Sequence, residues 1–350
     1  MYYQTYQITQ KLLKTYPTSK ILKTFSCQWH YRLGMASNNF RKVFQLTDKN
    51  TIRWFPGHMG KGLRQMQQQL KNVDCIIEVH DARLPISGRN PDFKHTIGGL
   101  KPHILALNKK DLTDTSLNSK LISDLKRNEG IDHVIYTNCK DHNCKGTKRL
   151  MPLAKDLIQN SDRFNRGDSK DFCIMVIGVP NVGKSSLLNV MRNRYLKQPK
   201  AAAVGAIAGI TRSVMNKIKV SEDPLVYMID TPGILTPRIA DDEMGMKLAL
   251  CGCLPDHLVG EELIADYLLY WLNRWENFKY VELMGLQEPT DNIMEVLVSG
   301  AKLLGRTQKR KHFDGSVAVV ADIQSSAQFF VKHFRKGYFG KVNLDAEFPS

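Results

Sequence analysis

Short apolar runs separated by helix-sized polar stretches occupy the chain between about residues 72 and 230. Runs of this length that are rich in valine and isoleucine are typical of strands buried on both faces of a parallel sheet. They lie at 73–79, 104–107, 134–136, 172–177, 215–220 and 225–229. The pattern therefore predicts an α/β fold, in which helices cover both faces of a mostly parallel sheet.

The pattern changes after about residue 255, where strand-like runs give way to helical periodicity. Apolar residues recur at i, i+3 and i+4 within 261–275 and again within 293–304. Such stripes are typical of helices that pack against a shared core. We therefore expect a first domain over 48–255 and a smaller, all-helical second domain over 256–350.

A phosphate-binding loop follows the strand expected at 172–177. The sequence GVPNVGKS, which ends at Ser185, matches the pattern G-x-x-x-x-G-K-[ST], and a helical pattern follows it. Backbone N–H groups of such a loop surround phosphate oxygens, while Lys184 would reach the β- and γ-phosphates and Ser185 would ligate Mg²⁺. The nucleotide contacts expected here are Pro180, Asn181, Val182, Gly183, Lys184, Ser185 and Ser186.

The strand expected at 225–229 ends in DTPG, from Asp230 to Gly233. A carboxylate at a strand tip beside the phosphate loop can hold Mg²⁺, directly or through a water molecule. A glycine N–H can approach the γ-phosphate because no Cβ stands in the way. These two residues are therefore candidates for the metal and γ-phosphate contacts.

The strand expected at 104–107 ends in NKKD, from Asn108 to Asp111. The Asp111 carboxylate can accept both donors of the guanine Watson–Crick edge. Asn108 can bond the opposite edge, and the Lys109 stem can cover the ring. Adenine would present an acceptor to Asp111, which is a costly mismatch in a buried polar site. The segment therefore predicts selectivity for guanine.

The order of these motifs differs from that of ordinary small GTPases, in which the phosphate loop comes first and the base-reading loop late. Here the base-reading loop (108–111) precedes the phosphate loop (178–185) and the DTPG segment (230–233). Each tetrapeptide alone fits an ordinary strand-to-loop turn. Three motifs at successive strand ends instead indicate a P-loop GTPase fold with a circularly permuted motif order.

With these motifs the chain resembles the YlqF/RbgA-type circularly permuted GTPases that assist assembly of the large ribosomal subunit, and in particular their mitochondrial members. The resemblance spans about residue 50 to the C-terminus. It also rests on WFPGHM (54–59), VHDARLP (79–85), SGRNP (87–91), TNC (137–139), GITR (209–212), DHLVG (256–260) and ADYLLY (265–270). The chain departs from the family at 204–209, where VGAIAG replaces a segment closer to Gly-Gly-x-Pro-Gly.

The resemblance implies further site residues. Thr137, Asn138 and Cys139 would form the loop that contacts the base through its backbone. Thr211 would be the switch threonine, which ligates Mg²⁺ and senses the γ-phosphate. Asn181 resembles the residue with which some related GTPases bind K⁺ next to the β,γ-bridge, where a cation can replace the charge of an arginine finger. A tolerated loop asparagine is an equal alternative.

The group that activates water is not at its usual place. Ras-like enzymes orient the attacking water with a glutamine just after the Asp-x-x-Gly element, and here that position is Ile234. The resemblance offers His58, whose imidazole could position water or accept its proton. In that interpretation His58 enters the site only on the ribosomal particle, so the isolated protein is slow. The alternative is a turn histidine with no catalytic role.

The formal net charge of +16 is concentrated at the two ends of the chain. Residues 1–47 carry seven basic side chains and no acidic one, which is the composition of a mitochondrial transit peptide. A disordered basic arm that binds RNA or anionic lipid is the alternative. Residues 301–350 carry nine basic and four acidic side chains with interleaved aromatic residues, which suits binding to ribosomal RNA. A solvated basic face, with Phe330 and Phe334 in the core, is the other possibility.

Cysteine content and hydropathy exclude several other classes. The seven cysteines include no pair of CxxC motifs, so we expect reduced thiols and neither a zinc site nor a disulfide framework. The most apolar run, 201–210, is well short of the roughly 20 residues that cross a bilayer. We therefore expect no transmembrane segment. The resemblance implies a place in the mitochondrial matrix, with peripheral attachment to the matrix side of the inner membrane.

The resulting prediction is a GTP-binding and GTP-hydrolysing assembly factor for the mitochondrial large ribosomal subunit, with GTP, Mg²⁺ and large-subunit rRNA as ligands and partners. It would regulate ribosome assembly and mitochondrial translation. A GTP-dependent rRNA-binding scaffold with negligible hydrolysis is the alternative, and Ile234 favours it. A nucleolar or cytosolic permuted GTPase is a third reading, although such proteins usually carry long charged extensions.

Overall fold

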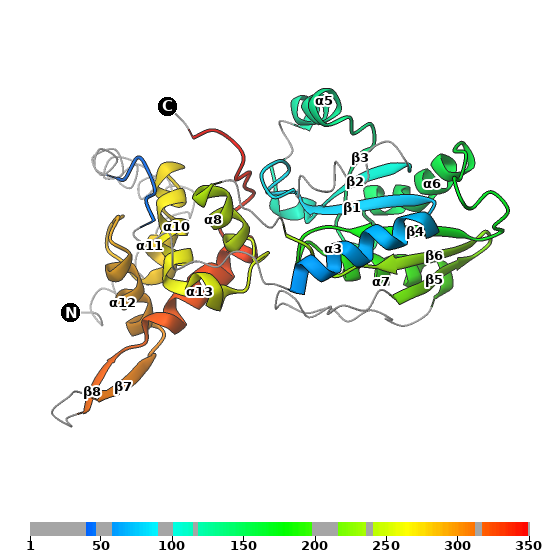
Figure 1. The fold of residues 1–350 in the computed structure, drawn as a ribbon. Helices are drawn as coiled ribbons and strands as arrows, with labels where there is room; N and C mark the ends of the chain where they lie inside the picture. Colours follow the sequence, from blue (N-terminus) through cyan, green and yellow to red (C-terminus); the bar gives the residue numbers. More distant parts are fainter. Residues whose placement is uncertain are drawn as a thin grey trace, which may run out of the picture.

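A computed structural model describes residues 40–46, 58–89, 101–114, 118–197, 216–235, 241–311 and 317–348. These residues form two lobes that lie side by side (Figure 1). Thr211 and the family segment 204–212 lie outside the described residues. In the part of the chain that is described, no helix has both the length and the apolar character needed to cross a bilayer.

The first lobe is built on a six-stranded sheet with the order β3-β2-β1-β4-β6-β5. Its parallel strands are β1 (Cys75–Asp81), β2 (His103–Asn108), β3 (Val134–Tyr136), β4 (Phe172–Ile177) and β6 (Leu225–Asp230). Strand β5 (Asn216–Glu222) pairs antiparallel with β6 at one edge. All six runs expected from the sequence are strands, and the predicted α/β fold is confirmed.

Helices cover both faces of this sheet, which explains the unbroken apolar runs. They are α3 (His58–Gln69), α5 (Asn118–Glu129), α6 (Lys145–Gln159) and α7 (Lys184–Leu196), with short 3₁₀ turns η2 (Leu70–Asn72) and η3 (Lys110–Leu112). Ile76 of β1 packs in one cluster with Met66 of α3. The next residue, Ile77, joins the opposite cluster with Leu150 of α6 and Leu187 of α7. Successive strand residues thus alternate between two buried faces.

The second lobe contains mainly helices (Figure 1). They are α8 (Asp242–Leu250), α9 (Asp256–Val259), α10 (Glu261–Arg274), α11 (Lys279–Met284), α12 (Ile293–Leu303) and α13 (Ile323–Arg335). The apolar stripes expected at 261–275 and 293–304 are the buried sides of α10 and α12. Because α8 packs against α10, this lobe begins before residue 256, the start expected from the sequence.

One element of the second lobe is a hairpin, so the expectation of an all-helical domain needs a correction. Strands β7 (Thr307–Lys311) and β8 (Val317–Ala321) pair antiparallel, with Lys309 opposite Val319. The hairpin projects from the lobe and leaves Val317 56% and Val319 64% exposed. Because it packs so little against the core, its residues lack the clear apolar alternation that marks a half-buried strand.

The C-terminal aromatic residues lie mostly in the core. Phe330 and Phe334 of α13, together with Phe339, are at most 3% exposed. Their rings pack against Tyr280 of α11 and Trp271 of α10, among others. These three phenylalanines therefore cannot alternate with basic side chains on an RNA-facing surface. The alternative placement of Phe330 and Phe334 in the core is confirmed.

Residues 40–46 pack on the second lobe, although the sequence placed them in the transit peptide. The Phe44 ring meets the edge of Tyr267 at a centroid distance of 5.1 Å. The Arg41 guanidinium forms ion pairs with Asp266 at 2.7 Å and with Asp291 at 3.1 Å. Residues 40–46 therefore belong to the folded second lobe.

Candidate functional site

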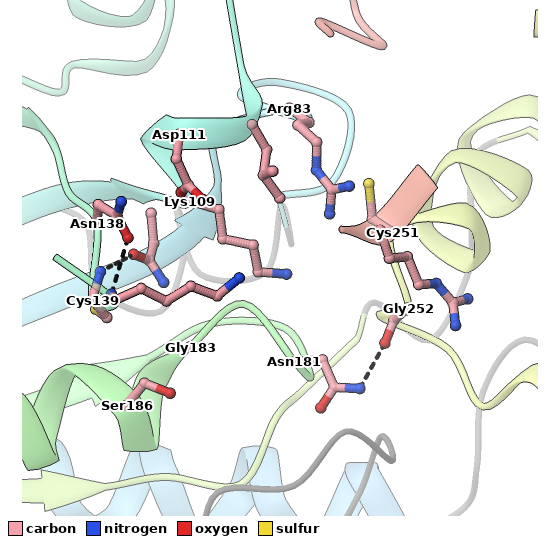
Figure 2. Close-up of a pocket in the computed structure, with 14 residues that line it drawn as sticks. Arg83, Lys109, Asp111, Asn138, Cys139, Asn181, Gly183, Ser186, Cys251 and Gly252 are labelled. Atoms are coloured by element: carbon pink, nitrogen blue, oxygen red, sulfur yellow. Dashed lines mark hydrogen bonds between the residues drawn. The ribbon is translucent and has the colours of Figure 1, made fainter. Parts of the chain in front are cut away.

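A pocket opens beyond the carboxyl ends of strands β1, β2 and β3, which is where ligands bind in open α/β sheets. It brings together the base-reading loop, residues 138–140 and the phosphate loop (Figure 2). Its lining residues are Arg83, Asn108, Lys109, Asp111, Leu112, Asn138, Cys139, Lys140, Asn181, Gly183, Ser186, Cys251, Gly252 and Arg335. The sequence indicated the first-lobe loops of this set, but not Arg83 or the three residues from the second lobe.

The phosphate loop joins β4 to α7, and two of its glycines are required by close backbone approach. Gly178 has φ +142°, and a Cβ there would lie 2.2 Å from the carbonyl oxygen of Val79. Gly183 has φ +107°, and its Cβ would lie 2.3 Å from Nδ2 of Asn108. No L side chain fits at either position without displacing a neighbour. The glycines of the motif therefore allow β1 and the base-reading loop to touch the phosphate loop.

Lys184 is the first residue of α7, and its ammonium group is buried within the phosphate loop. Nζ donates a hydrogen bond to the carbonyl oxygen of Val179 at 2.9 Å. Burial lowers the pKa of Lys184 to about 8, and the nearby charge of Asp230 only partly offsets this effect. The ammonium is thus a buried cation whose charged form a phosphate group would stabilise.

This pKa predicts how nucleotide affinity changes with pH. A bound phosphate favours the protonated amine, so it would raise the pKa of Lys184 above the value of about 8 that burial sets in the protein alone. Below pH 8 the amine is charged in both states, and Kd for GDP should be flat. As pH rises above 8, binding must take up a proton, and affinity should fall by up to about tenfold per pH unit. Titrations with GDP between pH 7 and 9 measure this dependence. The guanidinium of Lys184→Arg does not titrate in this range, so an equal fall in GDP affinity in that variant would contradict the prediction.

Ser185 and Asp230 form a pair that suits a hard divalent cation. The Ser185 hydroxyl donates to Oδ2 of Asp230 at 2.9 Å. The second oxygen, Oδ1, is buried and has no hydrogen-bond partner among the described residues. Burial raises the pKa of Asp230, although Lys184 and Ser185 act in the opposite direction. An orphaned carboxylate oxygen beside a hydroxyl is a donor set that fits Mg²⁺, which usually takes few protein ligands besides phosphate and water.

The DTPG segment lies directly against the phosphate loop. A Cβ on Gly233 would lie 2.6 Å from Cα of Pro180, so only glycine permits this approach. The next residue, Ile234, is 1% exposed and packs in the cluster with Met66 of α3. Ile234 therefore cannot orient water, as the sequence indicated. His58 is the first residue of α3, and its side chain lies outside the described part of the structure.

The Asn108 side chain connects the base-reading loop, the phosphate loop and the 137–139 loop by hydrogen bonds. Its Nδ2 donates to the carbonyl oxygen of Val182 at 2.8 Å, and its Oδ1 accepts from the backbone N–H of Cys139 at 3.2 Å. The Thr137 hydroxyl also donates to Oδ1, at 3.3 Å. The amide was expected to bond a guanine edge, but it is largely used within the protein and keeps one Nδ2 proton for the base. Its main structural effect is to set the base-reading loop against the phosphate loop.

Lys109 and Asp111 of the base-reading loop both line the pocket. Lys109 adopts a left-handed conformation, with φ 61°, and its Nζ forms an ion pair with Asp81 at 2.9 Å. Burial would raise the pKa of Asp81, but the charges of Arg83 and Lys109 hold that pKa below its ordinary value. This anchored ammonium stretches the lysine stem across the pocket. Asp111 is exposed and lines the pocket on the same side as Lys109 (Figure 2).

Comparisons with known proteins show what this chain is similar to. A family model described as "50S ribosome-binding GTPase" matches residues 173–297. Mitochondrial GTPase 1 of Aedes aegypti is 60% identical over 88% of this chain and 98% of that protein. Mitochondrial ribosome-associated GTPase 1 of Bos taurus is 51% identical over 88% of this chain and 92% of its own length. The crystal structure of GNP-bound YlqF from T. maritima covers 81% of this chain and 97% of that chain with a TM-score of 0.50 at 24% identity, so the two share a fold.

Proposed function

The chain belongs to the family of mitochondrial GTPase 1 and mitochondrial ribosome-associated GTPase 1 proteins and is a GTP-hydrolysing enzyme, and we propose that it assists assembly of the mitochondrial large ribosomal subunit. The observation that carries the proposal is the pocket at which Asn108 holds the base-reading loop against the phosphate loop. By acting on the large subunit, the protein would regulate ribosome assembly and mitochondrial translation.

The proposal gives each residue of the nucleotide site a role. Asp111 accepts the two donors of guanine, Lys109 covers the ring, and the backbone at 137–139 contacts its edge. Residues 180–186 surround the phosphates. Ser185 and Asp230, together with Thr211 from outside the described residues, would hold Mg²⁺, which would neutralise charge on the phosphates. The support for this assignment is the orphaned Oδ1 of Asp230 and the carbonyl-bound ammonium of Lys184.

Water activation is assigned to His58, at the start of α3. The buried Ile234 leaves the usual glutamine position without a polar group, so another element must supply one. We expect His58→Ala to bind GTP normally and to lose stimulation by the ribosomal particle; full stimulation would exclude the role. K⁺ binding beside Asn181 stays a prediction, and equal turnover in KCl and NaCl would contradict it.

Exposed basic side chains of the second lobe are the proposed contact with large-subunit rRNA. Arg306, Lys309, Lys332, Lys336 and Lys341 are exposed, and Tyr338 is 42% exposed beside them in sequence. Arg335 is excluded from this surface because it binds Asp256 at 2.7 Å within the protein. Phosphate contacts from lysine and arginine give affinity that falls steeply with salt.

This surface can be tested by its effect on turnover. GTP turnover should rise when purified mitochondrial large subunits are added. Charge reversal at Lys309, Arg310 and Lys311 should raise the particle concentration that gives half-maximal stimulation and flatten its salt dependence. Reversal at Lys71, Lys120 and Lys148, exposed on the first lobe, is the matched control. Unchanged half-saturation in the second-lobe variant would contradict the proposed surface.

The proposed location is the mitochondrial matrix, with peripheral attachment to the matrix side of the inner membrane. The import signal would end before residue 40, because residues 40–46 pack on α10. A reporter fused to residues 1–39 should therefore reach mitochondria, and a diffuse cytosolic reporter would contradict this proposal. Membrane attachment predicts that alkaline carbonate releases the protein from isolated inner membranes, whereas recovery in the soluble fraction before extraction would contradict it.

A further inference from the structure

The second lobe supplies one wall of the nucleotide pocket. Cys251 and Gly252, just after α8, line it opposite the base-reading loop (Figure 2). Arg335, at the end of α13, also lines the pocket. No motif of the G domain requires these residues. The pocket therefore lies between the lobes, and its shape depends on the contacts that hold the two lobes together.

On the phosphate side of the pocket, the two lobes are joined by a hydrogen bond from Asn181. This residue has φ 58°, the left-handed conformation, and its Nδ2 donates to the carbonyl oxygen of Gly252 at 2.8 Å. The bond is drawn in Figure 2. A residue of the phosphate loop, two positions before the N-cap Gly183 of α7, thus contacts the second lobe directly.

Arg335 holds Gly252 in the position that receives this bond. Helix α8 ends in a Schellman motif with Gly252 at φ +76°, in which the N–H groups of Gly252 and Cys253 donate to Ala249 O and Leu248 O. Two further donors reach the last carbonyl groups of the helix from α13. Arg335 provides them: Nε donates to Leu250 O at 3.0 Å and Nη2 to Ala249 O at 2.8 Å. The other edge of the guanidinium binds the Asp256 carboxylate at 2.7 and 2.8 Å. One side chain therefore sets the end of α8 relative to α9 and α13.

A second set of hydrogen bonds joins the two lobes on the base-reading side of the pocket. Just past Asp111, the carbonyl oxygen of Leu112 accepts from the N–H of Val342 at 3.0 Å, and the Thr113 hydroxyl donates to Val342 O at 3.0 Å. The carboxylate of Asp345 accepts from the N–H groups of Ile86 and Ser87 at 2.8 and 3.0 Å. The tail after α13 thus ties the base-reading loop to the same lobe that contacts Asn181.

We propose that Arg335 is a positioning residue for guanine nucleotide: it holds Gly252 against Asn181, so that the second lobe closes the pocket and slows nucleotide release. The inference rests on the proposed nucleotide site. Because coupling between two sites is reciprocal, a particle that binds and shifts the second lobe changes nucleotide affinity, and bound nucleotide changes affinity for the particle by the same factor.

The test is the release rate of a fluorescent GDP analogue from the full chain, measured by stopped flow. We expect Arg335→Ala to speed release by roughly tenfold. In an Asn181→Ala background the same substitution should have little further effect, because the contact is already lost. Gln324→Ala, an exposed position on α13, is the control and should match the wild type. Thermal unfolding without nucleotide checks that each variant is folded.

The outcomes separate this inference from the proposed function. If the wild type binds no guanine nucleotide, the proposed function itself is wrong. If the wild type binds GDP and Arg335→Ala releases it at the wild-type rate, the positioning role alone is wrong. Equal acceleration with and without Asn181 would also overturn it, since the effect would then not pass through the Gly252 contact. Should Arg335→Ala not fold, Asp256→Asn weakens the same clamp and should speed release in the same Asn181-dependent way.

Discussion

Replacing Asp111 by Asn should change the base specificity of the enzyme from guanine to xanthine. We expect Kd for GTP to rise roughly 10²- to 10⁴-fold, which corresponds to about 3–6 kcal/mol for two donors that lose a charged acceptor. Affinity for XTP should rise at the same time. Xanthine carries a carbonyl oxygen where guanine has its amino group, so the new amide can accept from N1–H and donate to that oxygen.

This expectation depends on the geometry around the base-reading loop. Lys109 is anchored to Asp81, and Asn108 is anchored to Val182 and Cys139, so the loop is held independently of the base. Asp111 is the exposed acceptor in this arrangement. The substitution keeps the size of the side chain, and the loop should keep its conformation. The effect is therefore on recognition and not on folding.

Competition between GTP and XTP, followed by hydrolysis of each, measures the change. Asp132→Asn, at a carboxylate that is 61% exposed and outside the pocket, is the matched control and should prefer GTP as the wild type does. Unchanged GTP affinity in Asp111→Asn would show that another residue reads the base.

Replacing Gly183 by Ala should nearly abolish nucleotide binding. The new Cβ would lie 2.3 Å from Nδ2 of Asn108, at a backbone φ of +107° that L residues rarely adopt. Backbone strain costs about 1–3 kcal/mol, and displacing Asn108 loses hydrogen bonds worth about 1 kcal/mol each. The sum predicts a loss of roughly 10²- to 10³-fold in affinity, because the same movement separates the base-reading loop from the phosphate loop.

Equilibrium binding of GDP checks this, with Gly167→Ala as the control. A Cβ at Gly167 meets nothing within 4 Å, so that variant should bind as the wild type does. Removing the clashing partner gives a second check: in an Asn108→Ala background, Gly183→Ala should cost less than it does alone. An alanine variant at 183 with wild-type affinity would mean that the loops are not packed as described.

The strands and the motif loops were accessible from the sequence because their signals are local. Runs such as 172–177 are apolar at every position since both faces of the sheet are covered, and the motifs follow directly at the strand ends. The carboxyl ends of parallel strands meet at one edge of the sheet. The order of the motifs was therefore enough to indicate a permuted GTPase with one nucleotide pocket.

The contribution of the second lobe was not accessible in this way. Gly252 and Arg335 are far apart in sequence and meet the phosphate loop only because α8 and α13 pack together. A glycine is typical of a helix C-cap and an arginine is typical of a surface cation, so neither residue type indicates a contact with the phosphate loop. The charge pattern even placed Arg335 on an RNA-binding surface, since sequence does not show that Asp256 already neutralises it. The same charge pattern grouped Phe330 and Phe334 with their basic neighbours in sequence. In α13, however, these two side chains lie on the buried side of the helix.

We propose that this enzyme couples GTP hydrolysis to binding of the mitochondrial large ribosomal subunit. The most direct measurement is the single-turnover rate of GTP hydrolysis by the purified protein, alone and with saturating large subunits, with small subunits as the control. We expect slow hydrolysis by the protein alone, an acceleration of about 10²-fold or more with large subunits, and no acceleration with small subunits. Negligible hydrolysis on the large subunit, as expected of a GTP-dependent scaffold, or the same rate with either subunit, would contradict it.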